Sequence, residues 1–298
     1  MITKTAMITI VGRANAGKST LTNKLTGDKV AIVSPKPQTT RNRIFGVFTY
    51  NDVQMVLLDT PGFHKAKTRL GDHMVGIVKE SVADVDAVVL LVEPADNIGT
   101  QEEMLIEHIK KSGVPAVLVI NKIDTVVPDL ILPVIKRYSE FFSFDAIVPV
   151  SAKKGDGIPE LLKVFENYSK PGPQLFPDGM STDQPEKQII AEIIREKLLI
   201  CLDKEIPHGT AVEITRFSER GDIDNAVIDV DATIFCEKQS HKGMIIGKSG
   251  SMLKKIGQFA REDIERFMGA KVFLQTWVKV KENWRDSKTM MKNFGYIK

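Results

Sequence analysis

Residues 12–19 read Gly12-Arg13-Ala14-Asn15-Ala16-Gly17-Lys18-Ser19 and match the pattern G-x-x-x-x-G-K-[ST]. The pattern follows a short apolar run, Met7–Val11, and precedes a stretch in which Leu21 and Leu25 recur at helical spacing. Glycines let successive backbone N–H groups turn inward around a phosphate, and the following helix adds the positive end of its dipole. A strand before and a helix after are the context that such a loop requires. The sequence therefore predicts a phosphate-binding loop here.

Further apolar runs alternate with helical patterns as far as residue 170: Arg43–Tyr50, Val53–Leu58, Ala87–Val92, Val114–Ile120 and Ala146–Val150. Most are typical of strands buried on both faces, and their alternation with helices predicts an α/β, doubly wound, mostly parallel sheet. Only Asn51-Asp52 separates the first two runs, which indicates a hairpin and one antiparallel edge strand.

The length of 298 residues favours two domains, because one domain usually has roughly 100–200 residues. A stretch rich in proline and glycine, Ser169–Pro185, can continue neither a helix nor a central strand. We therefore expect a first domain at 1–170, a linker at 171–185 and a second domain at 186–298.

The second domain has a different order of elements. A helical pattern to about Leu202 is followed by two alternating runs, Thr210–Phe217 and Ala226–Phe235. A glycine-rich turn, a helical stretch Ser251–Phe267 and a strand Lys271–Val280 complete it. The order αββααβ, with the glycine-rich turn between the two later helices, predicts an α+β domain.

The composition excludes several classes of protein. Hydrophobic residues make up 43% and charged residues 27%, which is ordinary for a globular protein. The longest apolar run, Ala87–Val92, is far shorter than the ~20 residues of a membrane-spanning helix. No secretion signal is recognisable at the N-terminus, and the two cysteines are too few for a disulfide framework. We expect a cytoplasmic protein.

The loop at 12–19 and two later motifs predict a nucleotide site with Mg²⁺. Lys18 can reach the β- and γ-phosphates and the Ser19 hydroxyl can ligate Mg²⁺. Asp59-Thr60-Pro61-Gly62 ends a predicted strand, so Asp59 is placed to hold Mg²⁺ through water and the Gly62 N–H to meet the γ-phosphate. In Gln38-Thr39-Thr40-Arg41 one threonine is expected to complete the coordination; we prefer Thr40, and Thr39 remains an alternative. The expected loop contacts are Gly12, Asn15, Ala16, Gly17, Lys18, Ser19 and Thr20.

A further motif selects the base. Asn121-Lys122-Ile123-Asp124 closes another predicted strand, and the Asp124 carboxylate can accept hydrogen bonds from guanine N1–H and its 2-amino group. Adenine offers neither donor on that edge. The Lys122 stem would cover the ring, and Asn121 would tie neighbouring loops together. After the next strand, Ser151-Ala152-Lys153 supplies a backbone N–H for guanine O6. These motifs, in this order at strand ends, predict GTP and GDP as ligands.

The residue after Gly62 is Phe63, where a glutamine could orient the attacking water. We therefore expect a GTPase with slow intrinsic hydrolysis, in which Lys18, Thr40, Gly62 and Asn15 act by positioning and electrostatics.

The second domain combines positive charge with a glycine turn. Residues 171–237 carry 6 basic and 14 acidic groups, whereas residues 238–298 carry 14 basic and 5 acidic groups, a balance of +9. A G-x-x-G turn lets the protein backbone approach a nucleic-acid backbone closely, and lysines beside it add attraction for phosphates. The expected RNA-binding residues are Lys242, Ile246, Gly247, Lys248, Ser249, Gly250, Lys254 and Lys255. Trp277 and Trp284 could stack on bases, although the alternation around Trp277 favours a core position.

The chain resembles the Era family of translation-factor-class P-loop GTPases, which assist ribosome assembly and end in a type II KH domain. The stretches that carry the resemblance are Gln38–Arg41, Asp59–Gly62, Thr182–Glu186, Arg195–Lys197, His241–Gly243 and Trp277–Asp286. The resemblance implies a monomer that binds near the 3′ end of 16S ribosomal RNA and takes part in maturation of the 30S small ribosomal subunit. It also implies some peripheral contact with the cytoplasmic face of the inner membrane. Related GTPases with an asparagine at the position of Asn15 use it to hold K⁺ near the phosphates.

Three alternatives stay open at this point. The first is an RNA-binding assembly factor with a structural, slowly hydrolysed nucleotide, which Phe63 favours. The second is a tRNA-modification GTPase, against which the G-x-x-G turn and the lack of a C-terminal catalytic cysteine motif argue. The third is a membrane-surface GTPase, for which the sequence offers no basic amphipathic helix.

Overall fold

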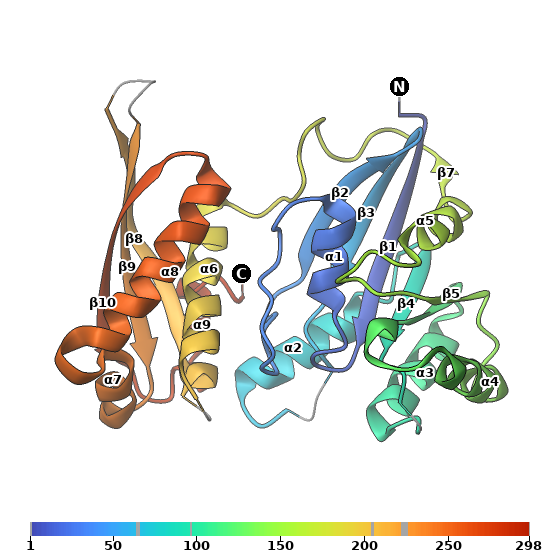
Figure 1. Cartoon of the computed structure of the whole chain (residues 1–298), viewed down its shortest axis with the longest axis horizontal. Helices are drawn as coiled ribbons and strands as arrows, with labels where there is room; N and C mark the ends of the chain where they lie inside the picture. The colour runs from blue at the N-terminus through green and yellow to red at the C-terminus, as the bar shows by residue number, and fades with distance from the viewer. Residues whose placement is uncertain (1, 64–65, 96, 204–205, 222–225, 298) are drawn as a thin grey trace. The chain divides into compact units, whose positions relative to one another are not determined.

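The computed structural model describes residues 2–63, 66–95, 97–203, 206–221 and 226–297 (Figure 1). The chain forms two compact units. The first comprises Met1–Ala31, Thr40–Lys67 and Gly71–Asp183, and the second comprises Ile32–Thr39, Thr68–Leu70 and Gln184–Lys298. Two short segments that precede the linker in sequence therefore belong with the second unit, which the division of the sequence at the linker did not anticipate.

The first unit is built on one sheet. Its strands follow the order β2-β3-β1-β4-β5-β6, and a short strand β7 also pairs with β1. Strand β2 is antiparallel to β3 and β7 to β1, whereas the other pairs are parallel. The bounds are β1 Lys4–Gly12, β2 Ile44–Tyr50, β3 Val53–Asp59, β4 Ala87–Val92, β5 Ala116–Ile120, β6 Ala146–Pro149 and β7 Lys170–Pro171. The mostly parallel sheet with an antiparallel edge strand is confirmed.

Helices cover both faces of this sheet, as Figure 1 shows. They are α1 Lys18–Thr26, α2 Arg69–Glu80, α3 Thr100–Ser112, α4 Ile131–Phe141 and α5 Ile158–Glu166. One buried cluster joins Leu21 of α1 and Phe165 of α5 to strand residues, and a second joins Val78, Ile109 and Tyr138 of α2, α3 and α4 to the other face. Strand side chains point alternately to the two faces, so both clusters draw on the same apolar runs.

The second unit packs helices against one face of a three-stranded sheet of order β10-β9-β8. Strand β9 is antiparallel to β8 and parallel to β10. The bounds are α6 Glu186–Cys201, β8 Ala211–Arg220, β9 Val227–Cys236, α7 Gln239–Ile246, α8 Ser251–Met268, β10 Lys271–Val280 and α9 Lys288–Asn293. The predicted order αββααβ is confirmed, and α9 adds a helix that the sequence did not indicate.

The two tryptophans differ in burial. Trp284 is fully buried, donates from Nε1 to the Gly209 carbonyl at 2.9 Å and packs against Phe294 and Tyr296. Trp277 is 45% exposed. The core position favoured for Trp277 is therefore wrong, because its side of β10 is an uncovered face of the sheet, where Phe273 is also exposed. Within the described part of the chain, no helix combines the length and the apolarity needed to cross a membrane.

Candidate functional site

The phosphate-binding loop joins β1 to α1. At position 17 the loop has space only for a glycine. Gly17 has φ +102°, and a Cβ there would lie 2.2 Å from Nδ2 of Asn121. A side chain at Gly17 would thus be strained in the backbone and would collide with the base-reading loop. Asn15 also adopts a positive φ of 67° and is exposed at the tip of the loop. The loop follows a strand and precedes a helix, as the sequence predicts.

Lys18 is held inside this loop. Its side chain is 5% exposed, and Nζ donates to the carbonyls of Gly12 at 3.1 Å and Arg13 at 2.8 Å. Burial lowers the pKa of Lys18 to about 8, although the nearby charge of Asp59 works in the opposite direction. The ammonium is therefore mostly protonated at neutral pH but poorly solvated, which favours the arrival of an anion.

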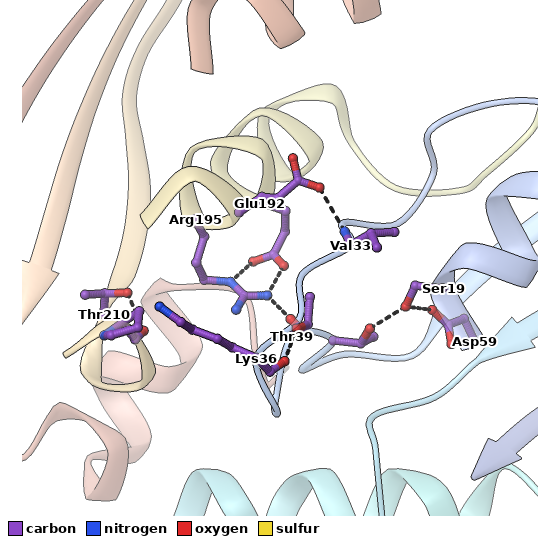
Figure 2. A network of polar contacts seen from close by, with 11 residues as sticks. Ser19, Val33, Lys36, Thr39, Asp59, Glu192, Arg195 and Thr210 are labelled. Carbon is purple, nitrogen blue, oxygen red and sulfur yellow. Dashed lines mark hydrogen bonds and ion pairs between the residues drawn. The ribbon is translucent and has the colours of Figure 1, made fainter. Parts of the chain in front are cut away.

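Three side chains predicted to hold Mg²⁺ lie together. The hydroxyls of Ser19 and Thr40 share a hydrogen bond of 2.8 Å, and Ser19 Oγ donates to Asp59 Oδ2 at 2.7 Å (Figure 2). Asp59 is fully buried, and its Oδ1 has no hydrogen-bond partner among the described residues. A buried carboxylate oxygen without a partner beside two hydroxyls fits a hard cation that prefers oxygen ligands.

Thr39 and Thr40 point to different places. The Thr39 hydroxyl donates to the carbonyl of Lys36 at 2.7 Å, within its own loop. The Thr40 hydroxyl shares a hydrogen bond with the Ser19 hydroxyl. Of the two alternatives left open by the sequence, the geometry favours Thr40 as the metal ligand.

Burial raises the pKa of Asp59 to about 6, against the lowering influence of Lys18 and of the hydrogen bond from Ser19. The ordinary value is 3.8, so the folded chain without nucleotide binds more protons than the unfolded chain between about pH 4 and 6. The contribution of Asp59 to stability is therefore present below pH 4 and is lost as the pH rises through 6.

Asparagine at position 59 cannot titrate, so Asp59→Asn should remove this pH dependence. In the absence of nucleotide, the free energy of unfolding of the variant minus that of wild type should increase from pH 4 to pH 6 and stay constant above pH 6. Urea unfolding at a series of pH values in EDTA measures the difference. If the free energies of unfolding of the two proteins depend on pH in the same way, the pKa of Asp59 is not raised by folding.

Gly62 and Phe63 sit against the phosphate-binding loop. A Cβ on Gly62 would lie 2.6 Å from Ala14 Cα, so glycine alone allows this approach. The Phe63 N–H donates to the Gly12 carbonyl at 3.1 Å, and its side chain is buried among apolar residues of the first unit. The side chain after Gly62 thus packs in the core and has no polar group with which to orient water.

The base-reading motifs converge at the ends of β5 and β6. Asn121 Nδ2 donates to the Ala16 carbonyl at 2.8 Å, and its Oδ1 accepts from the Ala152 N–H at 3.0 Å. Asn121 therefore ties the phosphate loop to the 151–153 turn, as the sequence predicts. Asp124 Oδ1 accepts from Ser151 Oγ at 2.7 Å, and this hydrogen bond is the main cause of a lowered pKa of Asp124.

Asp124 is consequently ionised at neutral pH, and a carboxylate that accepts one hydrogen bond keeps further acceptor sites. The two lysines of these motifs are more exposed. Lys122 forms an ion pair with Glu93, and Lys153 is exposed beside the buried Ser151 and Ala152.

The glycine turn of the second unit joins α7 to α8. Gly247 has φ +74°, and a Cβ there would lie 2.6 Å from Met252 Cβ. Lys248 and Ser249 are exposed between the two glycines, and Ile246 is half-buried. The turn therefore presents a short exposed backbone segment that has no bulky side chain at either end.

A groove of about 540 Å³ begins at this turn and runs between α8 and β10. It is lined by Gly250, Leu253, Lys254, Gly257, Gln258, Arg261, Leu274 and Thr276. Only Gly250 and Lys254 of these were predicted to bind RNA. Lys255 instead places Nζ 5.8 Å from the ring centre of Phe259, and Lys242, Gly247 and Lys248 do not line the groove. The spacing 250, 253, 254, 257, 258, 261 marks one face of a helix, a signal in the sequence from which the groove lining on α8 could have been found.

Comparison with known proteins defines a P-loop GTPase joined to a KH domain. Residues 7–122 match the family described as 50S ribosome-binding GTPase, and residues 205–285 match the KH domain. GTPase Era of Ruminiclostridium cellulolyticum is 50% identical over 293 residues, with 98% of this chain and 97% of that protein covered. GTPase Era of Clostridioides difficile is 49% identical over 294 residues, with 98% of each covered. The chain belongs to the Era family of GTPases, and its activity is the hydrolysis of GTP.

Two solved structures are similar over the whole chain. One is Era in complex with MgGDPNP and nucleotides 1506–1542 of 16S ribosomal RNA, with 37% identity and a TM-score of 0.95. The other is an Aquifex aeolicus Era variant bound to GDP and AlF₄⁻, with 37% identity and a TM-score of 0.94. Each comparison covers 99% of this chain and 100% of the other.

Proposed function

We propose that this GTPase is a switch that binds 16S ribosomal RNA near its 3′ end through the groove of its KH domain and assists assembly of the 30S subunit. The similarity along 99% of the chain to an Era structure that holds both MgGDPNP and 16S RNA carries this proposal. The groove supports it, because it begins at the G-x-x-G turn and carries two cationic side chains, Lys254 and Arg261, between apolar and small residues.

The nucleotide site supports a mechanism based on positioning. The Lys18 ammonium would bind the β- and γ-phosphates in place of its present carbonyl acceptors, and the Gly62 N–H would donate to the γ-phosphate. Ser19, Thr40 and Asp59 would hold Mg²⁺, which when bound neutralises phosphate charge. The residue after Gly62, Phe63, is apolar and buried, so its side chain does not orient water, and we expect slow intrinsic hydrolysis.

The RNA proposal predicts different roles for two adjacent lysines of α8. Lys254→Ala should weaken binding of an oligonucleotide with the sequence of the 16S 3′ end by about tenfold, because it removes a charged contact from the groove. Lys255→Ala is the matched control: it removes the same charge one residue away, on the Phe259 side, and should change the affinity by less than about twofold. Fluorescence anisotropy at fixed salt measures both.

The same titration tests whether the protein is a switch. Binding should be tighter with a non-hydrolysable GTP analogue than with GDP if GTP and RNA favour the same state. Equal affinities would favour the assembly factor with a structural nucleotide, the candidate that the buried Phe63 supports. Equal losses for Lys254→Ala and Lys255→Ala would contradict the assignment of the groove.

We also propose that K⁺ stimulates hydrolysis through Asn15, which carries an amide oxygen and is exposed at the tip of the loop. The turnover of GTP should be about tenfold faster in KCl than in NaCl. Asn15→Gly should abolish this difference, because glycine tolerates φ +67° but lacks the amide oxygen. Equal rates of the wild-type protein in both salts would remove the hypothesis.

A further inference from the structure

Segment 32–39, which we call the switch segment, is held by α6, the first helix of the second unit. Its residues belong with the second unit, and three of its groups bond to α6 or to the residue that caps it. The Val33 N–H donates to Glu196 Oε1 at 2.8 Å, Lys36 Nζ donates to the Leu202 carbonyl, and the Thr39 carbonyl accepts from Arg195 Nη2.

Arg195 is fully buried, and its partner is Glu192 one helical turn earlier. Glu192 accepts from Arg195 Nε at 2.8 Å and also from Nη2 (Figure 2). The other buried side chains of α6 that pack in the core are mostly isoleucine and leucine. A buried ion pair in such a helix contributes little to stability compared with apolar residues of similar volume. The ion pair with Glu192 orients the Arg195 guanidinium so that Nη2 donates a hydrogen bond to the Thr39 carbonyl.

The next residue of the chain carries the metal-binding hydroxyl. Because the peptide bond is planar, the Thr39 carbonyl oxygen and the Cα of Thr40 lie in one rigid plane. Fixing this oxygen therefore restricts the position of Thr40 Cα, from which the hydroxyl is two bonds away. In the first unit that hydroxyl is 2.8 Å from Ser19 Oγ.

We propose that Arg195, oriented by Glu192, is a positioning residue for Thr40: α6 influences the Mg²⁺ site through a hydrogen bond to the backbone of the switch segment. The inference rests on the proposed role of Thr40 as a metal ligand. The hydrogen bond from Arg195 to Thr39 lies within the second unit, and the hydrogen bond between Thr40 and Ser19 lies within the first. The Thr39–Thr40 peptide bond links the two.

The first test measures Mg²⁺ binding rather than hydrolysis. With a fluorescent non-hydrolysable GTP analogue, Arg195→Met should raise the half-saturating Mg²⁺ concentration by about tenfold, the effect of losing one hydrogen bond to a charged group. Arg285→Met, which breaks the ion pair with Glu237 in the same unit, should leave it unchanged. In the Thr40→Ala background, Arg195→Met should add no further change, whereas a merely structural role would give additive effects.

The second test needs neither metal nor nucleotide. Hydrogen exchange of the amides from Val33 to Arg41 should become about tenfold faster in Arg195→Met, with the core strands of both units unaffected. If Arg195→Met does not fold, Glu192→Gln serves instead; it retains the side-chain volume, weakens the orientation of Arg195 and should raise the Mg²⁺ requirement about threefold.

The outcomes separate the two claims. If Thr40→Ala leaves the Mg²⁺ requirement unchanged, the metal-ligand role fails and the inference fails with it. If Thr40→Ala raises the requirement but Arg195→Met does not, or adds to it independently, the positioning role of Arg195 alone is overturned.

Discussion

Replacing Asp124 with asparagine is expected to weaken GTP binding by roughly a thousandfold and to make xanthosine triphosphate the preferred nucleotide. In the proposed base-reading role the carboxylate would accept hydrogen bonds from guanine N1–H and the 2-amino group, and an amide in its place would turn one acceptor into a donor. Xanthine carries a carbonyl oxygen where guanine has the 2-amino group, so the amide N–H₂ finds an acceptor there. Competition of each triphosphate against a fluorescent nucleotide measures the change.

The fold should tolerate this substitution, because the amide that replaces the carboxylate would keep an oxygen to accept from Ser151 Oγ. Asp129→Asn is the matched control, since Asp129 is an exposed carboxylate five residues further along the chain. It should leave the affinity for GTP unchanged. Retained GTP selectivity in the Asp124 variant would show that another group reads the base.

Lys18→Met is expected to lower the turnover of GTP by roughly 10²–10³-fold, because it removes the buried cation that faces the developing phosphate charge. Single-turnover hydrolysis at saturating protein measures the loss. Lys24→Met is the control: it removes an exposed lysine of the same helix and should leave the rate unchanged.

The same variant should not lose thermal stability without nucleotide. Burial lowers the pKa of Lys18, so the charged side chain is held at a cost that methionine avoids. The Gly12 carbonyl also keeps the Phe63 N–H as a donor. A large fall of the melting temperature together with the fall in rate would instead assign Lys18 a structural role.

The sequence predicted the sheet, and the loops that carry the nucleotide motifs at its strand ends, because local signals determine both. Strands buried on both faces appear as continuous apolar runs, and the loops at their carboxyl ends carry recognisable spacings. Asn121 illustrates this: its motif predicted a tie between loops, and hydrogen bonds to Ala16 and Ala152 are what the structure has.

Properties that depend on tertiary packing were not accessible in this way. The choice between Thr39 and Thr40 depends on the direction of two adjacent hydroxyls, which no pattern encodes. The groove along α8 was not predicted, because it forms where α8 packs beside β10, and no local pattern encodes that packing. Nothing in the sequence placed residues 32–39 with the second unit.

The contact between Gly17 and Asn121 has a consequence for redesign of the pocket. Because the amide of Asn121 occupies the space next to Gly17 and also bonds to Ala16, the loop proposed to select the purine is in direct contact with the loop proposed to bind the phosphates. We therefore expect a change in one loop to disturb the other, so a library aimed at a new specificity should vary both loops together.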